Sequence, residues 1–349
     1  MLVLKLEAQI PLAPRTTLGV GGNAAHYARI ESEPELREAL AWAAARSVPV
    51  RVLGGGSNIV VDDAGFDGLV LEMAQRGISV TASGSVVEIR TAAGEPWDDF
   101  VGAMVASGYQ GLECLSGIPG RVGATPIQNV GAYGQDVSET ITRVLAFDCA
   151  LSALRTFSGA ECSFSYRDSF FKSHQPGRFI VTEVTFRLSP HAPPAIRYAE
   201  LERYFTAQGQ TAPSLAEVRE TVIGLRRSKS MVLDASDPNA RSCGSFFVNP
   251  VLDASEFRAF GERAQGEGDV PSFPQADGRV KLSAGWLIEH AGLPRGTRDG
   301  AVGLSTKHAL ALVAHEGARS SDVTRLAERV QRTVLARFGV RLHPEPNFW

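Results

Sequence analysis

Residues 50–58 read Val50-Arg51-Val52-Leu53-Gly54-Gly55-Gly56-Ser57-Asn58, a short β-branched run followed directly by a glycine-rich turn. The run over residues 50–53 predicts a strand. Successive glycines can adopt positive φ angles and present bare backbone amides, the geometry that wraps a pyrophosphate, and Ser57 and Asn58 add hydrogen-bond donors. The turn lacks the Lys-Ser/Thr pair of a P-loop, so the sequence disfavours nucleotide triphosphate hydrolysis. Taken alone, the run fits a plain tight turn as well as an anion-binding loop.

The segment before this turn predicts a strand and a helix. Residues 25–31 predict the strand, and Ser32-Glu33-Pro34-Glu35 predicts a helix start with a capping serine, early acids and a proline in the first turn. Leu36 and Leu40 continue the helix at the expected spacing. The opening unit is therefore strand-helix-strand, and it ends in a glycine turn at the carboxyl end of a strand, a common place for a ligand.

Strands and helices alternate along the rest of the chain. Strands are predicted over residues 78–82, 86–91, 143–148 and 179–188, and helices over residues 96–107, 214–229 and 254–265. The last helix carries one apolar stripe, formed by Val323, Leu326, Val330, Val334 and Phe338. We expect Ser321 to cap this helix and Gly339 to end it.

Composition excludes several classes of protein. At 349 residues, with 21% charged residues and a formal net charge of −3, the chain is an ordinary globular protein of about two to three domains. This charge gives no electrostatic footprint for nucleic acid or an anionic membrane. The four cysteines show no Cys-x-x-Cys pair and no His/Cys ligand spacing, so we expect reduced thiols, no metal site and no disulfide framework. The N-terminal residues predict no signal peptide or membrane span, and we expect a cytoplasmic protein.

A second glycine cluster occupies residues 116–134, which read Ser-Gly-Ile-Pro-Gly-Arg-Val-Gly-Ala-Thr-Pro-Ile-Gln-Asn-Val-Gly-Ala-Tyr-Gly. Two long glycine loops with small polar residues fit an extended dinucleotide lying between them better than two unrelated loops. Residues 19–24 also satisfy G-x-G-x-x-A. We interpret them as a turn entering a strand, because prolines precede them where a Rossmann site requires a strand.

The two glycine motifs together resemble the UDP-N-acetylenolpyruvoylglucosamine reductase family, and the resemblance runs from about residue 16 to residue 348. It implies an α+β chain with a vanillyl-alcohol-oxidase/p-cresol-methylhydroxylase-type FAD-binding fold of two subdomains, plus a C-terminal α+β substrate-binding domain. The expected boundaries are residues 1–75 with 329–349 for the first FAD-binding subdomain, 76–213 for the second, and 214–328 for the substrate-binding domain.

The resemblance implies FAD as the cofactor and NADPH as the hydride donor. The cofactor-binding residues that it implies lie in the two glycine motifs: Gly54, Gly55, Gly56, Ser57, Asn58, Ser116, Gly117, Ile118, Pro119, Gly123, Ala124, Gln128, Asn129, Gly131, Ala132 and Tyr133.

Three further motifs match the family and supply the implied catalytic residues. They are Tyr-Arg-Asp-Ser at 166–169, Gly-Ser-Phe-Phe-Val-Asn-Pro at 244–250 and His-Pro-Glu at 343–345. The resemblance implies that Arg167 holds a carboxylate or stabilises an enolate, that Ser245 donates a proton and that Glu345 is the third catalytic group. Without it, the same residues fit a solvated arginine in a surface turn, a serine satisfying a backbone group and a solvated carboxylate.

Substrate-binding positions transfer from the family less directly. The implied residues are Tyr166, Tyr198, Arg226, Lys229, Asn249 and Lys281. Within the basic run at residues 226–229, we assign Lys229 as the diphosphate-binding lysine. The alternative interpretation is that this run forms one exposed face of a helix. The segment that connects this run to Gly244, beginning Met231-Val232-Leu233-Asp234, is the longer of the forms found in the family. The register that assigns Lys229 is therefore open.

The implied activity is the reduction of UDP-N-acetylglucosamine enolpyruvate to UDP-N-acetylmuramate, a step of peptidoglycan precursor synthesis. We expect small-molecule partners only, and a monomer. Two alternatives remain at this point: an alcohol or sugar oxidase of the same flavin fold, and a non-catalytic UDP-sugar- or flavin-binding homologue.

Overall fold

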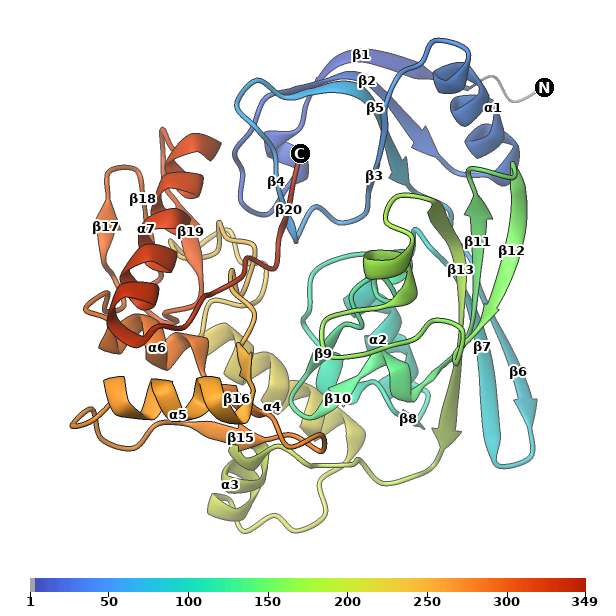
Figure 1. The fold of residues 1–349 in the computed structure, drawn as a ribbon. Helices are drawn as coiled ribbons and strands as arrows, with labels where there is room; N and C mark the ends of the chain where they lie inside the picture. The colour runs from blue at the N-terminus through green and yellow to red at the C-terminus, as the bar shows by residue number, and fades with distance from the viewer. Residues whose placement is uncertain (1–3) are drawn as a thin grey trace. The chain divides into compact units, whose positions relative to one another are not determined.

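The computed structural model describes residues 4–349. The chain forms two compact units that interleave in sequence (Figure 1). Unit 1 contains residues up to Ile10, Ala24–Gly55 and Asp67–Arg227, and unit 2 contains Pro11–Asn23, Gly56–Phe66 and Ser228–Trp349. The division into three parts that the sequence suggests remains a prediction.

The first sheet of unit 1 has the strand order β1 (Leu6–Pro11), β2 (Asn23–Ile30), β5 (Phe66–Met73) and β3 (Val50–Leu53), with β3 parallel to β5. Helix α1 (Glu33–Ala44) joins β2 to β3. Its predicted start is confirmed, because Ser32 and Glu35 form a reciprocal capping box. The predicted strand-helix-strand unit is therefore present, and the first glycine turn directly follows β3.

The second sheet of unit 1 has the order β12 (Ala153–Ser158), β11 (Ile141–Asp148), β13 (Phe179–Pro190), β7 (Val86–Ala92) and β6 (Ile78–Ser83), and β8 (Tyr109–Gln110) also pairs with β13. These pairs are antiparallel. Helix α2 (Trp97–Ala106) joins this core through Trp97 and Phe100, whose rings lie 6.0 and 5.1 Å from that of Phe186. Packing of α2 against the sheet fixes the position of its first turn.

Two helices and one hairpin complete unit 1. Helices α3 (Ala199–Ala207) and α4 (Leu215–Ser228) share a small apolar cluster, in which Leu201 and Phe205 of α3 join Val218 and Val222 of α4. The hairpin of β9 (Gly131–Ala132) and β10 (Gln135–Asp136) lies within the second glycine cluster.

Unit 2 is built from short elements around one apolar core. Its sheets are β14 (Val251–Leu252), β16 (Val280–Leu282) and β15 (Ser272–Pro274), then β17 (Arg298–Asp299), β18 (Val302–Leu304) and β19 (Leu312–Ala314), and the parallel pair β20 (Asn347–Phe348) and β4 (Ile59–Val60). Its helices are α5 (Ala254–Arg263), α6 (Ala284–His290) and α7 (Ser320–Phe338). The predicted stripe of α7 is confirmed, since all its members are buried in this core.

The predicted cap of α7 is wrong. The carboxylate of Asp63 accepts hydrogen bonds from the backbone N–H groups of Ser320 (2.7 Å) and Ser321 (3.2 Å). The Ser321 hydroxyl donates to the same carboxylate at 2.7 Å instead of accepting from the helix. The end of the helix is confirmed, because Gly339 adopts φ +73°, the left-handed conformation that closes helices.

We expect Asp63→Ala to lower the free energy of unfolding by about 1 kcal/mol, because it leaves the first N–H groups of α7 without their acceptor. Burial raises the pKa of Asp63, but the hydrogen bonds from Ser321 and Ser320 outweigh it and hold the pKa below its usual range. The stabilisation is therefore present above the unfolded pKa of about 4 and disappears as the pH falls through the lower folded pKa.

Urea unfolding of wild type and variant at neutral and acid pH measures this difference. Asp67→Ala is the matched control, because Asp67 is an exposed aspartate on neighbouring β5. Equal stabilities of wild type and Asp63→Ala at neutral pH would contradict the assigned cap.

Candidate active site

The two glycine loops meet inside unit 1. A Cβ placed on Gly55 would lie 2.6 Å from the Cα of Gly120, and one on Gly54 would lie 3.5 Å from the Cβ of Ala124. The first distance is too short for any side chain, so the loops pack backbone against backbone at Gly55. The structure therefore brings Gly54 and Gly55 of the first glycine motif next to Ala124 and Gly120 of the second cluster.

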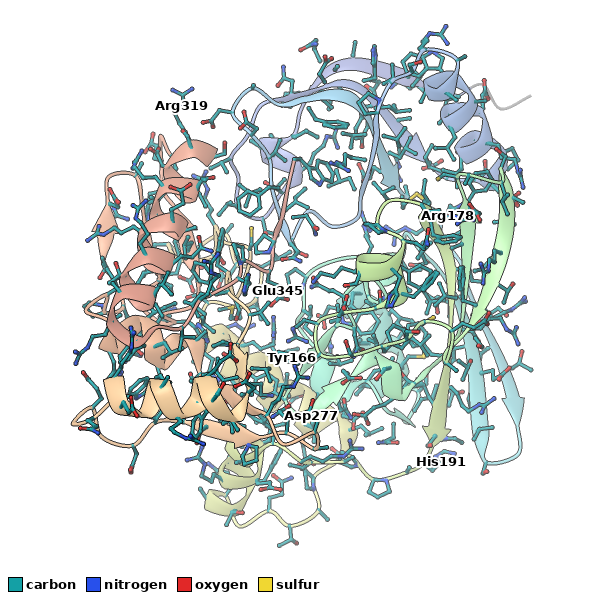
Figure 2. All side chains as sticks on the ribbon, in the orientation of Figure 1. Tyr166, Arg178, His191, Asp277, Arg319 and Glu345 are labelled. Atoms are coloured by element: carbon teal, nitrogen blue, oxygen red, sulfur yellow. The ribbon has the colours of Figure 1, made fainter. Side chains whose placement is uncertain are left out.

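The predicted catalytic arginine occupies a tight turn in unit 1. Ser165 and Asp168 exchange backbone hydrogen bonds of 3.1 and 3.2 Å, which leaves Tyr166 and Arg167 at the tip. Arg167 adopts φ +56°, a conformation that non-glycine residues rarely adopt and that often occurs at functional sites. Tyr166 is exposed, and its ring centroid lies 5.5 Å from the Arg167 guanidinium carbon (Figure 2).

The Arg167 side chain reaches the second glycine loop. Its Nη2 donates to the carbonyl of Gly131 at 2.7 Å and its Nη1 donates to the carbonyl of Asn129 at 3.5 Å. The buried side chain of Asn129 donates in turn to the carbonyl of Ser165 at 3.0 Å, at the base of the arginine turn. Arg167 thus forms one hydrogen-bonded arrangement with Asn129 and Gly131, two of the predicted cofactor-binding residues.

Tyrosines and a second arginine lie beside this arrangement. The rings of Tyr133 and Tyr198 pack edge to face with centroids 5.4 Å apart. Burial raises the pKa of Tyr133 to about 12, so its phenol is protonated and can donate a hydrogen bond at neutral pH. Burial lowers the pKa of Arg226, Tyr133 opposes this shift and Arg167 adds to it. The Asp98 carboxylate also raises the pKa of Arg226, and an arginine stays charged in proteins, so Arg167 and Arg226 are both cations of unit 1.

The other two predicted catalytic residues lie on paired segments of unit 2. The N–H of Glu345 donates to the carbonyl of Phe246 at 2.9 Å, and the N–H of Val248 donates to the carbonyl of His343 at 3.0 Å. These bonds pair the segment that follows Ser245 with the C-terminal segment. The prolines on either side of Glu345 lack N–H groups and lie where this pairing needs none.

The first glycine motif also reaches the C-terminal segment within unit 2. Asn58 accepts a hydrogen bond from the N–H of Asn347 at 3.0 Å and donates its side-chain amide to the carbonyl of Glu345 at 3.4 Å. Glu345 is half-buried and is labelled in Figure 2. Pairing on both sides therefore fixes the backbone that carries the Glu345 carboxylate.

Ser245 precedes Phe246 and Phe247, which are both buried. Its own side chain is half-buried, and its hydroxyl makes no hydrogen bond with any protein group among residues 4–349. The structural alternative, in which Ser245 satisfies a backbone group, is therefore wrong for the described part of the chain.

The predicted substrate-binding residues of unit 2 have distinct surroundings. Asn249 accepts a hydrogen bond from the N–H of Ala284 at 2.9 Å, at the start of α6. Lys281 lies on β16 with its ammonium 5.8 Å from the ring centroid of Phe273. Lys229 directly follows α4 and begins the connection to Ser245.

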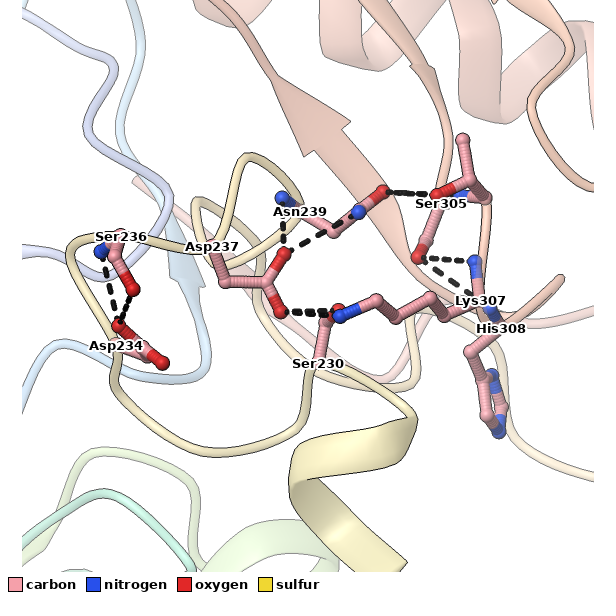
Figure 3. A network of polar contacts seen from close by, with 9 residues as sticks. Ser230, Asp234, Ser236, Asp237, Asn239, Ser305, Lys307 and His308 are labelled. Carbon is pink, nitrogen blue, oxygen red and sulfur yellow. Dashed lines mark hydrogen bonds and ion pairs between the residues drawn. The ribbon is translucent and has the colours of Figure 1, made fainter.

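A polar network that the sequence did not reveal anchors this connection (Figure 3). One oxygen of Asp237 accepts from the hydroxyl of Ser230 at 2.6 Å and from the ammonium of Lys307 at 2.9 Å. The buried side chain of Asn239 accepts from the N–H of Thr306 at 2.9 Å. Burial raises the pKa of Asp237, but these hydrogen bonds hold it well below its usual range. The network therefore fixes the backbone next to Lys229, and no local pattern links residues 237 and 307.

Three further findings concern the cysteines, possible metal ligands and the apolar character of the helices. The four cysteines are free thiols. Within residues 4–349, no group of three or more His, Cys, Asp or Glu side chains could hold a metal ion. Among the helices of the same residues, none has both the length and the apolar character of a membrane span.

Known proteins resemble the chain over both units. The FAD binding domain family matches residues 24–152, and the family described as UDP-N-acetylenolpyruvoylglucosamine reductase, C-terminal domain, matches residues 237–349. The chain is 48% identical to the UDP-N-acetylenolpyruvoylglucosamine reductase of Thermobifida fusca over 344 residues, which cover 97% of this chain and 96% of that protein. It is 42% identical to the reductase of the same name from Azoarcus sp. over 351 residues, covering 99% and 98%.

A solved structure agrees with these sequence matches. The crystal structure of UDP-N-acetylenolpyruvylglucosamine reductase from Thermus caldophilus superposes with a TM-score of 0.68 at 26% identity, covering 99% of this chain and 100% of that one. The predicted α+β class, with an FAD-binding fold and a C-terminal substrate-binding domain, is thereby confirmed. On this near-complete coverage, the chain belongs to the UDP-N-acetylenolpyruvoylglucosamine reductase family.

Proposed function

We propose that the chain reduces UDP-N-acetylglucosamine enolpyruvate to UDP-N-acetylmuramate, with NADPH as the electron source and FAD as the bound cofactor. The full-length family match supports the reaction. The observation that carries the site is the pairing in unit 2 of the Ser245 and Glu345 segments, with a Ser245 hydroxyl that is not used within residues 4–349. We also propose that the protein is a monomer and that it catalyses this step of peptidoglycan precursor synthesis in the cytoplasm.

The residues present fit FAD. Gly55 meets Gly120 at a distance that excludes a side chain, so no side chain at this point keeps a pyrophosphate away from the backbone of the two loops. Gly54–Asn58 and Ser116–Tyr133 would supply these contacts. FAD held by these residues would supply the hydride chemistry that links NADPH to the vinyl carbon of the substrate.

Arg167 supplies positive charge where negative charge develops. Addition of hydride to the vinyl methylene carbon leaves an electron pair on the adjacent carbon, delocalised into the substrate carboxylate. Arg167 is already held by the carbonyls of Gly131 and Asn129, so its guanidinium pays little reorganisation cost as that charge forms. Arg226 adds a second cation in unit 1, and we propose that it contacts an anionic group of the substrate.

Ser245 completes the reaction by proton transfer. Its hydroxyl hydrogen moves to the carbon that holds the electron pair, which gives the lactyl ether of the product, and the serine oxygen then takes a proton from solvent water. A serine is a weak acid, but the enolate is a strong base, so the transfer is favourable. We propose that Glu345 orients the reacting groups and that Lys229, Lys281, Asn249, Tyr166 and Tyr198 bind the UDP-sugar.

The visible spectrum of the flavin, recorded without oxygen, tests the proposed function. NADPH should bleach the flavin band, and the enolpyruvyl substrate should restore it. A flavin that stays reduced with this substrate but recovers in air would support the oxidase. A UDP-sugar that binds without reoxidising the flavin would support the non-catalytic homologue. Either result would overturn the proposed reaction.

A further inference from the structure

The first turn of α2 contacts one loop at three points. The Trp97 indole N–H donates to the carbonyl of Leu115 at 3.0 Å, and the Trp97 backbone N–H donates to the carbonyl of Gly120 at 3.1 Å. Between them, the Asp98 carboxylate oxygen Oδ1 accepts from the N–H of Gly117 at 2.6 Å. Two consecutive residues thus hold both ends and the middle of the loop at residues 115–120.

Asp98 also binds helix α4. Arg219 donates from Nη1 to Asp98 Oδ1 at 2.6 Å and from Nη2 to Asp98 Oδ2 at 3.0 Å, a two-point pair. Burial raises the pKa of Asp98. The hydrogen bonds from Arg219 and Gly117 and the charges of Arg219 and Arg226 outweigh this effect and hold the pKa below its usual range. Asp98 is therefore ionised at neutral pH, and a single carboxylate links the loop to the helix that carries Arg226 near its end.

The contact at Gly117 matters for the shape of the loop. Gly117 adopts φ +72°, and Gly120 lies against Gly55 of the first glycine loop. Because a peptide unit is planar, fixing the N–H of Gly117 also fixes the carbonyl of Ser116. A loop that is already ordered loses less conformational entropy when a ligand binds.

We propose that Asp98 is a positioning residue for the flavin, which holds the loop at residues 115–120 in its FAD-binding shape and ties it to α4 through Arg219. This inference rests on the proposed assignment of Ser116–Pro119 to the flavin. Neither Asp98 nor Arg219 contacts the reacting atoms in this proposal; both act through the loop.

Release of FAD from the full-length holoprotein tests the role of Asp98. Asp98→Ala removes an ionised acceptor, and we expect FAD to dissociate about tenfold faster than from wild type. The increase in flavin fluorescence after dilution measures this release. Asp98→Asn keeps one acceptor oxygen and should restore release to within about threefold of wild type. With FAD saturating, the kcat of both variants should stay within about twofold of wild type, because the reacting groups are untouched. Asp99→Ala is the matched control, since Asp99 is exposed in the same helical turn.

Hydrogen exchange separates failure of this inference from failure of the site assignment. In wild type, binding of FAD should slow amide hydrogen exchange in residues 115–120. If exchange does not slow, the assignment of this loop to the flavin is wrong, and so is the role of Asp98 that rests on it. Slowing in wild type with unchanged FAD release from Asp98→Ala would overturn the inference alone, even if the variant melts at a lower temperature. If Asp98→Ala does not fold, wild-type FAD release and wild-type loop exchange in Arg219→Met would overturn it.

Discussion

Ser245→Ala should still let NADPH reduce the flavin but should slow the reaction of the reduced enzyme with the enolpyruvyl substrate by about 10²–10⁴-fold, the usual contribution of a positioned proton donor. The hydroxyl makes no hydrogen bond with protein groups among residues 4–349, so its removal breaks no internal contact of the described chain. Anaerobic stopped-flow absorbance measures the two half-reactions separately: bleaching by NADPH, then recovery of the oxidised flavin band with the substrate.

The control for this experiment removes a different hydroxyl from the same unit. Ser255 is exposed in the first turn of α5, where its hydroxyl donates to Asp253. Ser255→Ala should leave both half-reactions unchanged. Ser245→Cys keeps a proton donor and should recover part of the lost rate. Recovery of the oxidised flavin at the wild-type rate in Ser245→Ala would show that another group donates the proton.

Sequence alone predicts those parts of the fold that depend on residues close together in the chain. The apolar stripe from Val323 to Phe338 needs only the helical repeat, and Ser32 and Glu35 form the α1 cap from adjacent residues. The cap of α7 was predicted wrongly because its acceptor is Asp63, 257 residues before Ser320. A local pattern contains no information about a partner at that distance.

The same limit applies to the two units. Residues 59–60 pair with residues 347–348, at opposite ends of the chain, and unit 2 takes up two short segments from the N-terminal part. Nothing in the composition of residues 11–23 or 56–66 marks them as part of unit 2. The interleaving follows from hydrogen bonds such as that between Asn347 and Asn58, which no sequence period predicts.

For the site, motif resemblance identified residues but not the groups that hold them. Arg167 was named from its motif, yet its contacts with Gly131 and Asn129 and its left-handed backbone required the structure. Asp98 and Asp237 carry no motif at all. Their importance depends on Arg219 and Lys307, which lie 121 and 70 residues away.

Replacement of Arg167 by methionine should lower the rate of flavin reoxidation by the enolpyruvyl substrate by about 10²–10³-fold, as does loss of one donor from a preorganised anion site. Methionine approximates the unbranched aliphatic part of the arginine side chain and removes its charge. Both residues have unbranched Cβ atoms, so the cost of φ +56° is similar in wild type and variant. The measurement is the single-turnover rate under saturating substrate, in the absence of oxygen.

Arg167→Lys distinguishes charge from geometry. A lysine restores the positive charge but not the planar fork that contacts Gly131 and Asn129 together, so we expect only partial recovery of the rate. Arg187→Met is the control in unit 1, because Arg187 is exposed and pairs only with Glu88 among the described ion pairs, a contact that contributes little. Two results would contradict the role assigned to the fixed guanidinium. A wild-type rate of flavin reoxidation in Arg167→Met would show that Arg167 takes no part in the chemical step. A fully recovered rate in Arg167→Lys would show that positive charge alone suffices.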